Sequence, residues 1–126
     1  MNLVDCPLEA AGDTVAVVLP DGQKIVLPKE RAEVLRPYIG NTICFGVRPE
    51  DLSEAQPGTP NTIHAVVSVY ELLGAEVFLY FTINGANMTA RVNPKTDART
   101  GSEVKFAIDV DKVHVFDKET EQTITN

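Results

Sequence analysis

The chain has 126 residues, of which 44% are apolar and 23% charged, and its formal net charge is −7 at pH 7. This size and composition are typical of one globular domain with its own core and exclude a disordered chain. The lysines and arginines are scattered, so the acidic balance disfavours nucleic acids and anionic membranes as partners. No signal peptide opens the chain and no apolar run approaches the roughly 20 residues of a membrane span, so we expect a soluble, cytoplasmic protein.

The first half of the chain predicts a hairpin, a helix and a third strand. Residues 14–19 (TVAVVL) stop at 20–22 (PDG), where Asp-Gly supplies the positive φ of a tight turn, and 23–27 (QKIVL) return as the partner strand. Residues 29–38 (KERAEVLRPY) are the one stretch that predicts a helix. Residues 42–47 (TICFGV) predict the third strand, which an acidic turn follows.

The second half begins after a polar loop rich in proline and glycine at 53–61. Residues 63–73 predict one long strand, and 76–83 (EVFLYFTI) are continuously apolar, which predicts a strand buried on both faces. Asn84-Gly85 predicts a second hairpin. Further strands are expected at 87–92, 103–108 and 113–116, followed by a solvated tail at 117–126. We interpret four aromatic residues of this half as core residues, namely Tyr70, Phe78, Tyr80 and Phe81.

The two halves resemble each other when the chain is aligned on itself with a shift of about sixty residues. Residues 40–47 (GNTICFGV) align with 101–108 (GSEVKFAI), and a hairpin and a proline precede each of these segments. Half a barrel cannot bury its own apolar face. We therefore expect two related half units, at about 1–60 and 61–116, to close against each other in an all-β barrel with one short helix.

The motifs that usually carry catalysis or nucleotide binding are missing from the sequence. It contains no phosphate-binding glycine loop and no G-x-S-x-G elbow. His64 and His114 are far apart and are interpreted as structural strand residues. Cys6, in a predicted loop, and Cys44, in a predicted strand, lack metal-ligand spacing and are interpreted as buried or idle thiols. We therefore expect no catalysis, no metal and no cofactor in this chain, and we interpret its carboxylate pairs, at 50–51 and at 109 and 111, as hydrated turn residues.

One motif points to a known family. Gly46-Val47-Arg48-Pro49-Glu50 resembles the G-[IV]-R-P-E-x-[LI] signature in the C-terminal regulatory portion of ABC importer ATPase subunits of the maltose, multiple-sugar and glycerol-3-phosphate type. Five other segments, in the same order, are similar to segments of that family: 1–3 (MNL), 27–28 (LP), 69–76 (VYELLGAE), 89–92 (TARV) and 113–117 (VHVFD). The resemblance extends to about Thr120. The sequence departs from the family at 98–100, at Glu121, where the family often has glycine, and in lacking the ATPase half.

The resemblance implies a fold and an assembly. It implies a TOBE domain of tandem OB-type β-barrels at 1–120, which meets the same domain of a second ATPase subunit and so holds a homodimer together. ATP and Mg would be bound only by the ATPase domain of the parent, at the inner face of the cell membrane. The membrane subunits and a regulatory protein are further implied partners. The contacting residues we expect are Arg48, Pro49, Glu50, Glu71, Gly74, Glu76, His114, Phe116 and Asp117.

Other interpretations stay open beside this one. The chain is expected to be a fragment cut at the domain boundary, and a free-standing protein is the alternative. Related paired barrels hold molybdate or tungstate at backbone N–H groups, which leave no side-chain signature in a sequence, so an oxyanion-binding or small-ligand-binding module is the rival function. A nucleic-acid-binding barrel is disfavoured by the charge.

Overall fold

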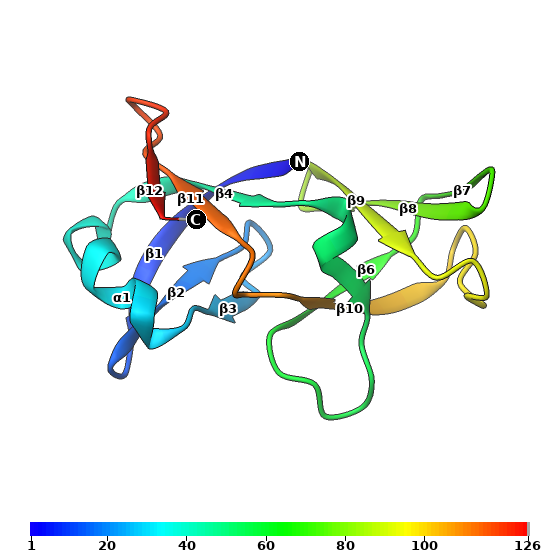
Figure 1. The fold of residues 1–126 in the computed structure, drawn as a ribbon, viewed down its shortest axis with the longest axis horizontal. Coiled ribbons are helices and arrows are strands. Elements are labelled where there is room, and N and C mark those ends of the chain that lie inside the picture. Colours follow the sequence, from blue (N-terminus) through cyan, green and yellow to red (C-terminus); the bar gives the residue numbers. More distant parts are fainter. Residues whose placement is uncertain (126) are drawn as a thin grey trace.

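The computed structural model describes residues 1–125, which form twelve strands, one α-helix and two 3-10 helices (Figure 1). The first half contains β1 (Asn2–Ala11), β2 (Thr14–Val18), β3 (Lys24–Val26), α1 (Lys29–Leu35), η1 (Arg36–Tyr38), β4 (Thr42–Val47), η2 (Pro49–Asp51) and β5 (Leu52–Glu54). The second half contains β6 (Thr62–Val66), β7 (Val69–Leu73), β8 (Glu76–Ile83), β9 (Ala86–Val92), β10 (Glu103–Ile108), β11 (His114–Phe116) and β12 (Thr123–Thr125). The prediction of an all-β chain with one short helix is confirmed. Within residues 1–125, no helix has the length and apolarity needed to cross a bilayer.

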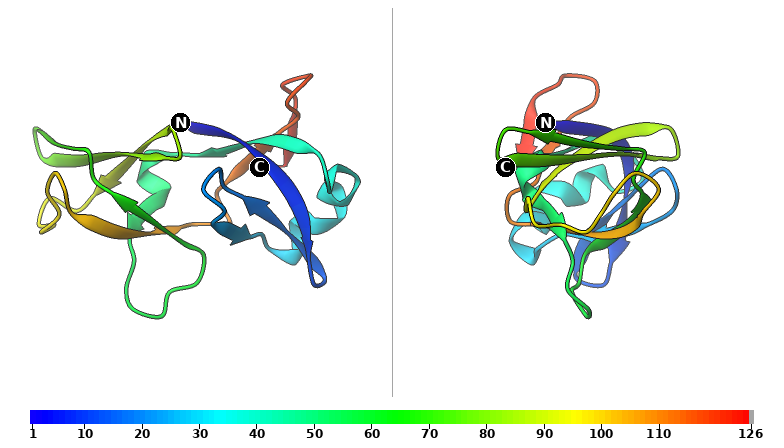
Figure 2. Two further views of the ribbon diagram at one scale, coloured as in Figure 1. Left: turned by 180° about the vertical axis from the view of Figure 1, so that it is seen from behind. Right: turned by 90° about the vertical axis from the view of Figure 1, so that its right-hand side faces the viewer.

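The strands form two lobes that lie side by side along the longest axis of the molecule (Figures 1 and 2). The first lobe is a six-stranded sheet in the order β12-β11-β4-β1-β2-β3, with α1 packed against β2. The second lobe contains two three-stranded sheets, β5-β10-β6 and β7-β8-β9. The strand content is that of the expected OB-type fold, but the sheets do not close into one single barrel.

The first strand was not indicated by the sequence, and the prediction of a loop around Cys6 is wrong. Along β1 the side chains alternate between buried and exposed, and Cys6 is fully buried. The sequence did not predict this strand because Pro7 lies within it, and a proline inside a segment argues against a strand there. The structure tolerates it because Pro7 is the last residue of β1 paired with β4, and Leu8 is the first paired with β2.

The long strand predicted at 63–73 is two strands in two different sheets. The chain turns a corner at Val67 and Ser68, between β6 and β7. At this corner the backbone N–H of Val67 donates to the carbonyl oxygen of Ser102 over 2.8 Å, and that of Ser68 donates to the carbonyl oxygen of Tyr80 over 2.8 Å. The corner has no glycine or proline, so nothing in the local sequence signals it.

The prediction that 76–83 is buried on both faces is wrong, although the strand itself forms as β8. Its buried positions alternate, and Phe81 lies in the core. Phe78 and Tyr80 point to the opposite face and are only half-buried, so these two aromatic residues are not the core residues we expected. Tyr70 on β7 is partly buried and packs against the core.

The two halves exchange strands, so that each completes a sheet of the other. β11 of the second half pairs with β4, and β5, which falls in the predicted turn and loop, pairs with β10. Phe45 lies opposite Val115 and Gly46 opposite His114. In the other exchange, Phe106 lies opposite Glu54 and Ala107 lies opposite Ser53. Each of these four residues is 61 positions away from its counterpart in the first exchange, later in the chain for the β4 residues and earlier for the β11 residues. The repeat expected from sequence is therefore present as a repeat of strand register.

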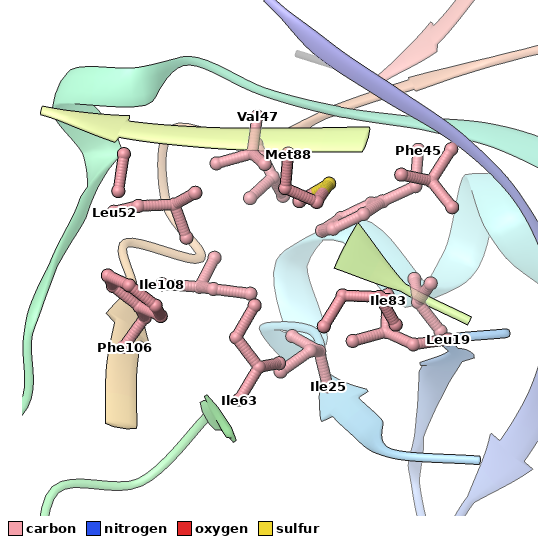
Figure 3. Close-up of a cluster of buried hydrophobic side chains, with 14 of the residues drawn as sticks. Leu19, Ile25, Phe45, Val47, Leu52, Ile63, Ile83, Met88, Phe106 and Ile108 are labelled. Atoms are coloured by element: carbon pink, nitrogen blue, oxygen red, sulfur yellow. The ribbon is translucent and has the colours of Figure 1, made fainter. Parts of the chain in front are cut away.

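A continuous core joins the two halves. Side chains from both meet in one cluster, with Phe45 and Leu52 from the first half near Ile63 and Ile108 from the second (Figure 3). In the second lobe the rings of Phe81 and Phe106 stack with centroids 4.5 Å apart. Burial of this kind is worth about 1.5 to 3 kcal/mol for each large apolar side chain, so the shared core favours a single folding unit.

Polar contacts also cross between the halves. The side-chain amide of Asn2, which is buried, donates to the carbonyl oxygen of Thr89 over 2.8 Å, and its oxygen accepts from the N–H of Thr89 over 2.8 Å. Arg31 on α1 is buried as well, and its guanidinium donates to the carbonyl oxygens of Asp111, over 2.6 Å, and Val113. Arg31 thus holds the segment that leads into the exchanged strand β11.

The C-terminal segment is not the solvated tail predicted from sequence. Residues Thr123–Thr125 form β12, which pairs with β11, and Ile124 packs partly against the core. The predicted tail also includes residue 126, which lies outside the described residues. The run of mostly polar residues at 117–125 contains a short edge strand, which turns back and pairs with β11, the strand just before it in the chain.

Replacing Arg31 with methionine should lower the free energy of unfolding by about 2 to 3 kcal/mol, because the variant leaves two carbonyl oxygens of the β10–β11 connection without their charged donor. Urea titration followed by circular dichroism measures this loss. Arg36→Met is the matched control, since Arg36 is exposed and donates to a single carbonyl oxygen, that of Asp13. The control should lose about 0.5 kcal/mol or less. Equal losses in both variants would contradict a special role for Arg31.

Candidate functional site

The first group of predicted site residues lies where the two halves meet. Arg48 and Glu50 are exposed on the η2 turn, with Pro49 half-buried at its start. They line a hollow of about 450 Å³ together with four other residues, Asp51, Asp111, Lys112 and His114. The backbone N–H of Asp109 donates to the carbonyl oxygen of Asp51 over 3.1 Å, which joins the two equivalent turns. This hollow carries both signs of charge and is open to solvent.

The motif glycine of this segment has a packing reason. A Cβ atom on Gly46 would lie 2.8 Å from Sδ of Met1, 3.1 Å from Cε2 of Phe116 and 3.2 Å from Cδ2 of Leu3. The absence of a side chain at Gly46 therefore leaves room for these three side chains over the backbone of β4. The ring of His114 stacks beside that of Phe116, with centroids 6.1 Å apart. Gly46 is thus explained by the fold, whatever the surface around it does.

An apolar groove adjoins the hollow along β11. Met1, Leu3, Cys44 and Phe116 supply its apolar wall, and the groove measures about 660 Å³. Its rim is mostly acidic and consists of Asp5, Asp117, Lys118 and Glu121. Lys118 pairs with Asp5 over 3.5 Å. The groove therefore presents an apolar floor inside a negative border.

Asp117 at this rim is a turn residue. Its carboxylate oxygen Oδ1 accepts hydrogen bonds from the backbone N–H groups of Thr120, over 3.1 Å, and Glu119, over 2.9 Å. These donors hold the pKa of Asp117 below its ordinary value, because they stabilise the charged form. The carboxylate thereby shapes the connection between β11 and β12, which is a structural task.

The remaining predicted site residues, Glu71, Gly74 and Glu76, lie on the β7–β8 hairpin of the second lobe. Gly74 forms its turn at φ 61°. The carboxylate of Glu71 accepts a hydrogen bond from the hydroxyl of Tyr80 over 2.8 Å, and this contact raises the pKa of Tyr80. Glu76 pairs with Arg91 over 3.5 Å. All these groups are at least partly exposed, so their charges are screened by water.

The structure thus brings some predicted residues together and separates others. Arg48, Glu50 and His114 share the hollow, and Phe116 and Asp117 line the adjoining groove. The β7–β8 hairpin lies at the far end of the other lobe (Figure 1). Sequence reasoning missed the apolar side chains exposed around that hairpin, which are Val66, Val69, Leu72 and Leu73. The available signal for these exposed side chains was the high apolar content of the segment at 63–73.

Neither the cysteines nor the acidic residues form a reactive centre in the part of the chain that the structure describes. Within residues 1–125, no group of three His, Cys, Asp or Glu side chains is placed to hold a metal ion. Cys6 is buried in β1, and burial raises its pKa to about 12. Partial burial and the charge of Asp5 raise the pKa of Cys44 as well. The arrangement of the described residues therefore offers surfaces for contact and two poorly reactive thiols.

Comparison with known families divides the chain in two. Residues 1–52 match the family described as the MalK OB fold domain, and residues 57–115 match the TOBE domain. The boundary between the matches, residues 53–56, falls at the end of β5 and the start of the loop that follows it.

Two curated relatives are similar over most of this chain. One is the oligosaccharides import ATP-binding protein MsmX of Bacillus subtilis, 36% identical over 106 residues, which are 79% of this chain and 29% of the relative. The other is the trehalose/maltose import ATP-binding protein MalK of Thermococcus litoralis, 36% identical over 93 residues, which are 69% of this chain and 25% of the relative. The chain therefore spans less than a third of the length of these relatives.

A solved structure shares the fold. The cytoplasmic molybdate-binding protein ModG, in a molybdate-bound crystal form, aligns with a TM-score of 0.67 at 17% identity and covers 90% of this chain and 94% of its own. At this identity the likeness concerns the fold alone.

The two thiols should differ sharply in reactivity. A disulfide-forming thiol reagent should modify Cys44 in the folded chain, because this side chain reaches the apolar groove, and should modify Cys6 only after unfolding. Since the pKa of Cys44 is raised, the rate should rise about tenfold for each pH unit between about 7 and 8.5, in step with the thiolate fraction. Spectrophotometric counting of released reagent measures one thiol in buffer and two in denaturant. Two thiols in buffer would place Cys6 at the surface.

Proposed function

The chain belongs to the family of MalK-type OB-fold and TOBE domains found in ATP-binding subunits of sugar-import ABC transporters, and we propose that it is the regulatory and dimerisation domain of such a subunit. The observation that carries this proposal is the order of the two family matches, which together run from residue 1 to residue 115. Relatives named for sugar import match across the same boundary.

The physical properties of the chain support a role in contact rather than in catalysis. The exchanged strands and shared core make one stiff unit that presents an open hollow, an apolar groove and an exposed apolar hairpin. A contact domain needs such surfaces and no reactive side chain. A permanent contact at one end of a subunit raises the effective concentration of the ATPase domains at its other end, which favours their closure around ATP.

The wider assembly follows as part of the proposal. The parent subunit would hydrolyse ATP at the cytoplasmic, inner face of the cell membrane, with ATP and Mg held by its ATPase domain. This chain would contact the same domain of a second subunit and would catalyse nothing itself. The hollow around Arg48, Glu50 and His114 and the groove at Phe116 and Asp117 would remain available to a regulatory protein.

A pull-down from membranes of the source organism tests the transporter assignment. Antibody raised against this chain should recover a membrane-associated polypeptide, and mass spectrometry should find peptides of this chain and of a P-loop ATPase domain in one band. Preimmune antibody is the control. Recovery of this chain from the soluble fraction alone, with no ATPase peptides, would contradict the assignment.

Oxyanion binding is the second candidate function, and the shared fold with the molybdate-binding protein ModG favours it. The net charge of −7 opposes anion binding, and three carboxylates line the hollow at the junction of the halves. We therefore expect isothermal titration with molybdate, up to about millimolar concentration, to give no heat beyond dilution. Sulfate at equal ionic strength is the control. Saturable micromolar binding would make the oxyanion function the better proposal.

A further inference from the structure

Two hairpin turns, one from each half of the chain, touch at the surface of the molecule. The β2–β3 turn contains Pro20, Asp21 and Gly22, and the β8–β9 turn consists of Asn84 and Gly85. The side-chain nitrogen Nδ2 of Asn84 donates to the carbonyl oxygen of Pro20 over 3.0 Å. This hydrogen bond links residues 64 positions apart and therefore joins the two halves at a point outside their exchanged strands.

The two turns lead away from the shared core. Leu19 precedes the first turn and Ile83 precedes the second, and each side chain is only 2% exposed. Both belong to the core cluster in which side chains of the two halves meet (Figure 3). A change that loosens the contact between the turns would therefore let water reach the edge of this core, so the contact should contribute to the free energy of unfolding.

The sequence of the second turn is chemically reactive. Asparagine is thermolabile in proteins, because the backbone nitrogen of the next residue can attack its side-chain carbonyl carbon and close a five-membered ring. Glycine at the next position hinders this attack least, since it has no Cβ atom. Asn84 is followed by glycine, whereas the other asparagines within residues 1–125 are followed by leucine, threonine, methionine or proline.

The fold leaves the attacking nitrogen of Gly85 accessible. Ile83 lies opposite Ala86, so Asn84 and Gly85 are the two central residues of the turn, and the ladder hydrogen bonds of the hairpin belong to the flanking residues. Both turn residues are exposed, with φ of 46° and 90°. Apart from its chain neighbours, no heavy atom of residues 1–125 lies within 4 Å of the place that a Cβ atom on Gly85 would take. Water and base therefore reach this turn.

The facing turn holds a similar pair, Asp21-Gly22, in a protected form. Oδ1 of Asp21 accepts from the backbone N–H of Gln23 over 3.1 Å, and Oδ2 accepts from Nε2 of Gln23 over 2.5 Å. An ionised carboxylate is a poor target for a nucleophile, and here both of its oxygens are engaged. Asn84, by contrast, is a neutral amide that is held through the nitrogen that would leave. The reactive residue of the two turns is therefore Asn84.

We propose that Asn84 is a site of spontaneous deamidation, and that its conversion weakens the contact between the two turns. The nitrogen of Gly85 loses its proton and forms a bond to Cγ of Asn84, the Cγ–Nδ2 bond breaks, and ammonia leaves with that proton. Water then opens the succinimide ring at either of its carbonyl carbons, which gives aspartate or isoaspartate at position 84. This proposal concerns the chain alone and does not depend on the proposed function.

The products cannot make the contact that asparagine makes. An ionised carboxylate accepts hydrogen bonds and donates none, so it faces the carbonyl oxygen of Pro20 as one acceptor faces another. Its charge joins that of Asp21 in the same pair of turns, in a chain whose net charge is already −7. Isoaspartate also adds a backbone methylene group to a two-residue turn, and the turn sets the register of β8 and β9. Each product therefore favours separation of the turns.

Peptide mapping by mass spectrometry tests the site. Incubation of the folded chain should raise the mass of the peptide that contains Asn84 by about 1 Da, the difference between an amide and an acid. The reaction should be faster at alkaline than at neutral pH, because base removes the proton of the attacking nitrogen. Asn87, exposed on the same hairpin but followed by methionine, is the internal control, and fragment ions should show it reacting about tenfold or more slowly.

The urea-unfolded chain provides the reference for this measurement. An Asn84 that keeps its amide in the folded chain, under conditions that deamidate it in the unfolded chain, would overturn the proposal. Equal rates at Asn84 and Asn87 would overturn it as well, because the glycine would then have no effect.

Three variants test the effect on the contact. Asn84→Asp is the aspartate product, and Asn84→Gly removes the amide donor without adding a charge, at a position where glycine tolerates the positive φ. In urea titrations, Asn84→Asp should raise the unfolding equilibrium constant about tenfold, and Asn84→Gly should raise it less. Asn87→Asp adds the same charge at an exposed position of β9 and should change the constant by less than about threefold. Equal effects of the two aspartate variants would overturn the proposed weakening, since net charge alone would explain it.

Discussion

The exchange of strands between the two halves is the constraint on which the rest of this structure depends. β4 would be left without its partner β11, and β10 without β5, if the halves were separated. The same register appears in both exchanges, so the two turns that follow β4 and β10 meet back to back, where Asp109 donates to Asp51. Arg31 and Asn2 add hydrogen bonds across the halves at separate points. A single cooperative unit follows, because unpaired strand edges and half a core cannot be stable alone.

This constraint also explains the sequence motif that first suggested the family. Gly46 makes room for side chains that cover β4, and Pro49 begins the η2 turn, in which the N–H of Asp51 donates to the carbonyl oxygen of Arg48 over 2.9 Å. Both positions thus have a local structural role beside the exchanged strand β11. Part of the motif is thus explained by the fold, while the side chains of Arg48 and Glu50 are exposed at the hollow.

The surfaces available for contact differ in charge, and this difference separates their partners. The groove along β11 has an apolar floor and a mostly acidic rim, which suits a basic partner and opposes a second copy. The outer face of the β7–β8–β9 sheet carries both signs of charge, from Glu71, Glu76 and Arg91, beside aromatic and aliphatic side chains.

The sequence by itself determined the hairpins, the one helix, most strand positions and the repeat, because turn residues and side-chain alternation act within a few residues. It also identified the family through short ordered motifs. Only the tertiary structure decided that β1 continues through Pro7, that the chain turns between β6 and β7, and that residues 123–125 pair with β11. It alone decided which face of β8 remains open. The first two features depend on partners far away in the chain, and the third on a mostly polar segment that turns back onto the strand before it. The local sequence pattern is the same whether or not such a partner is present.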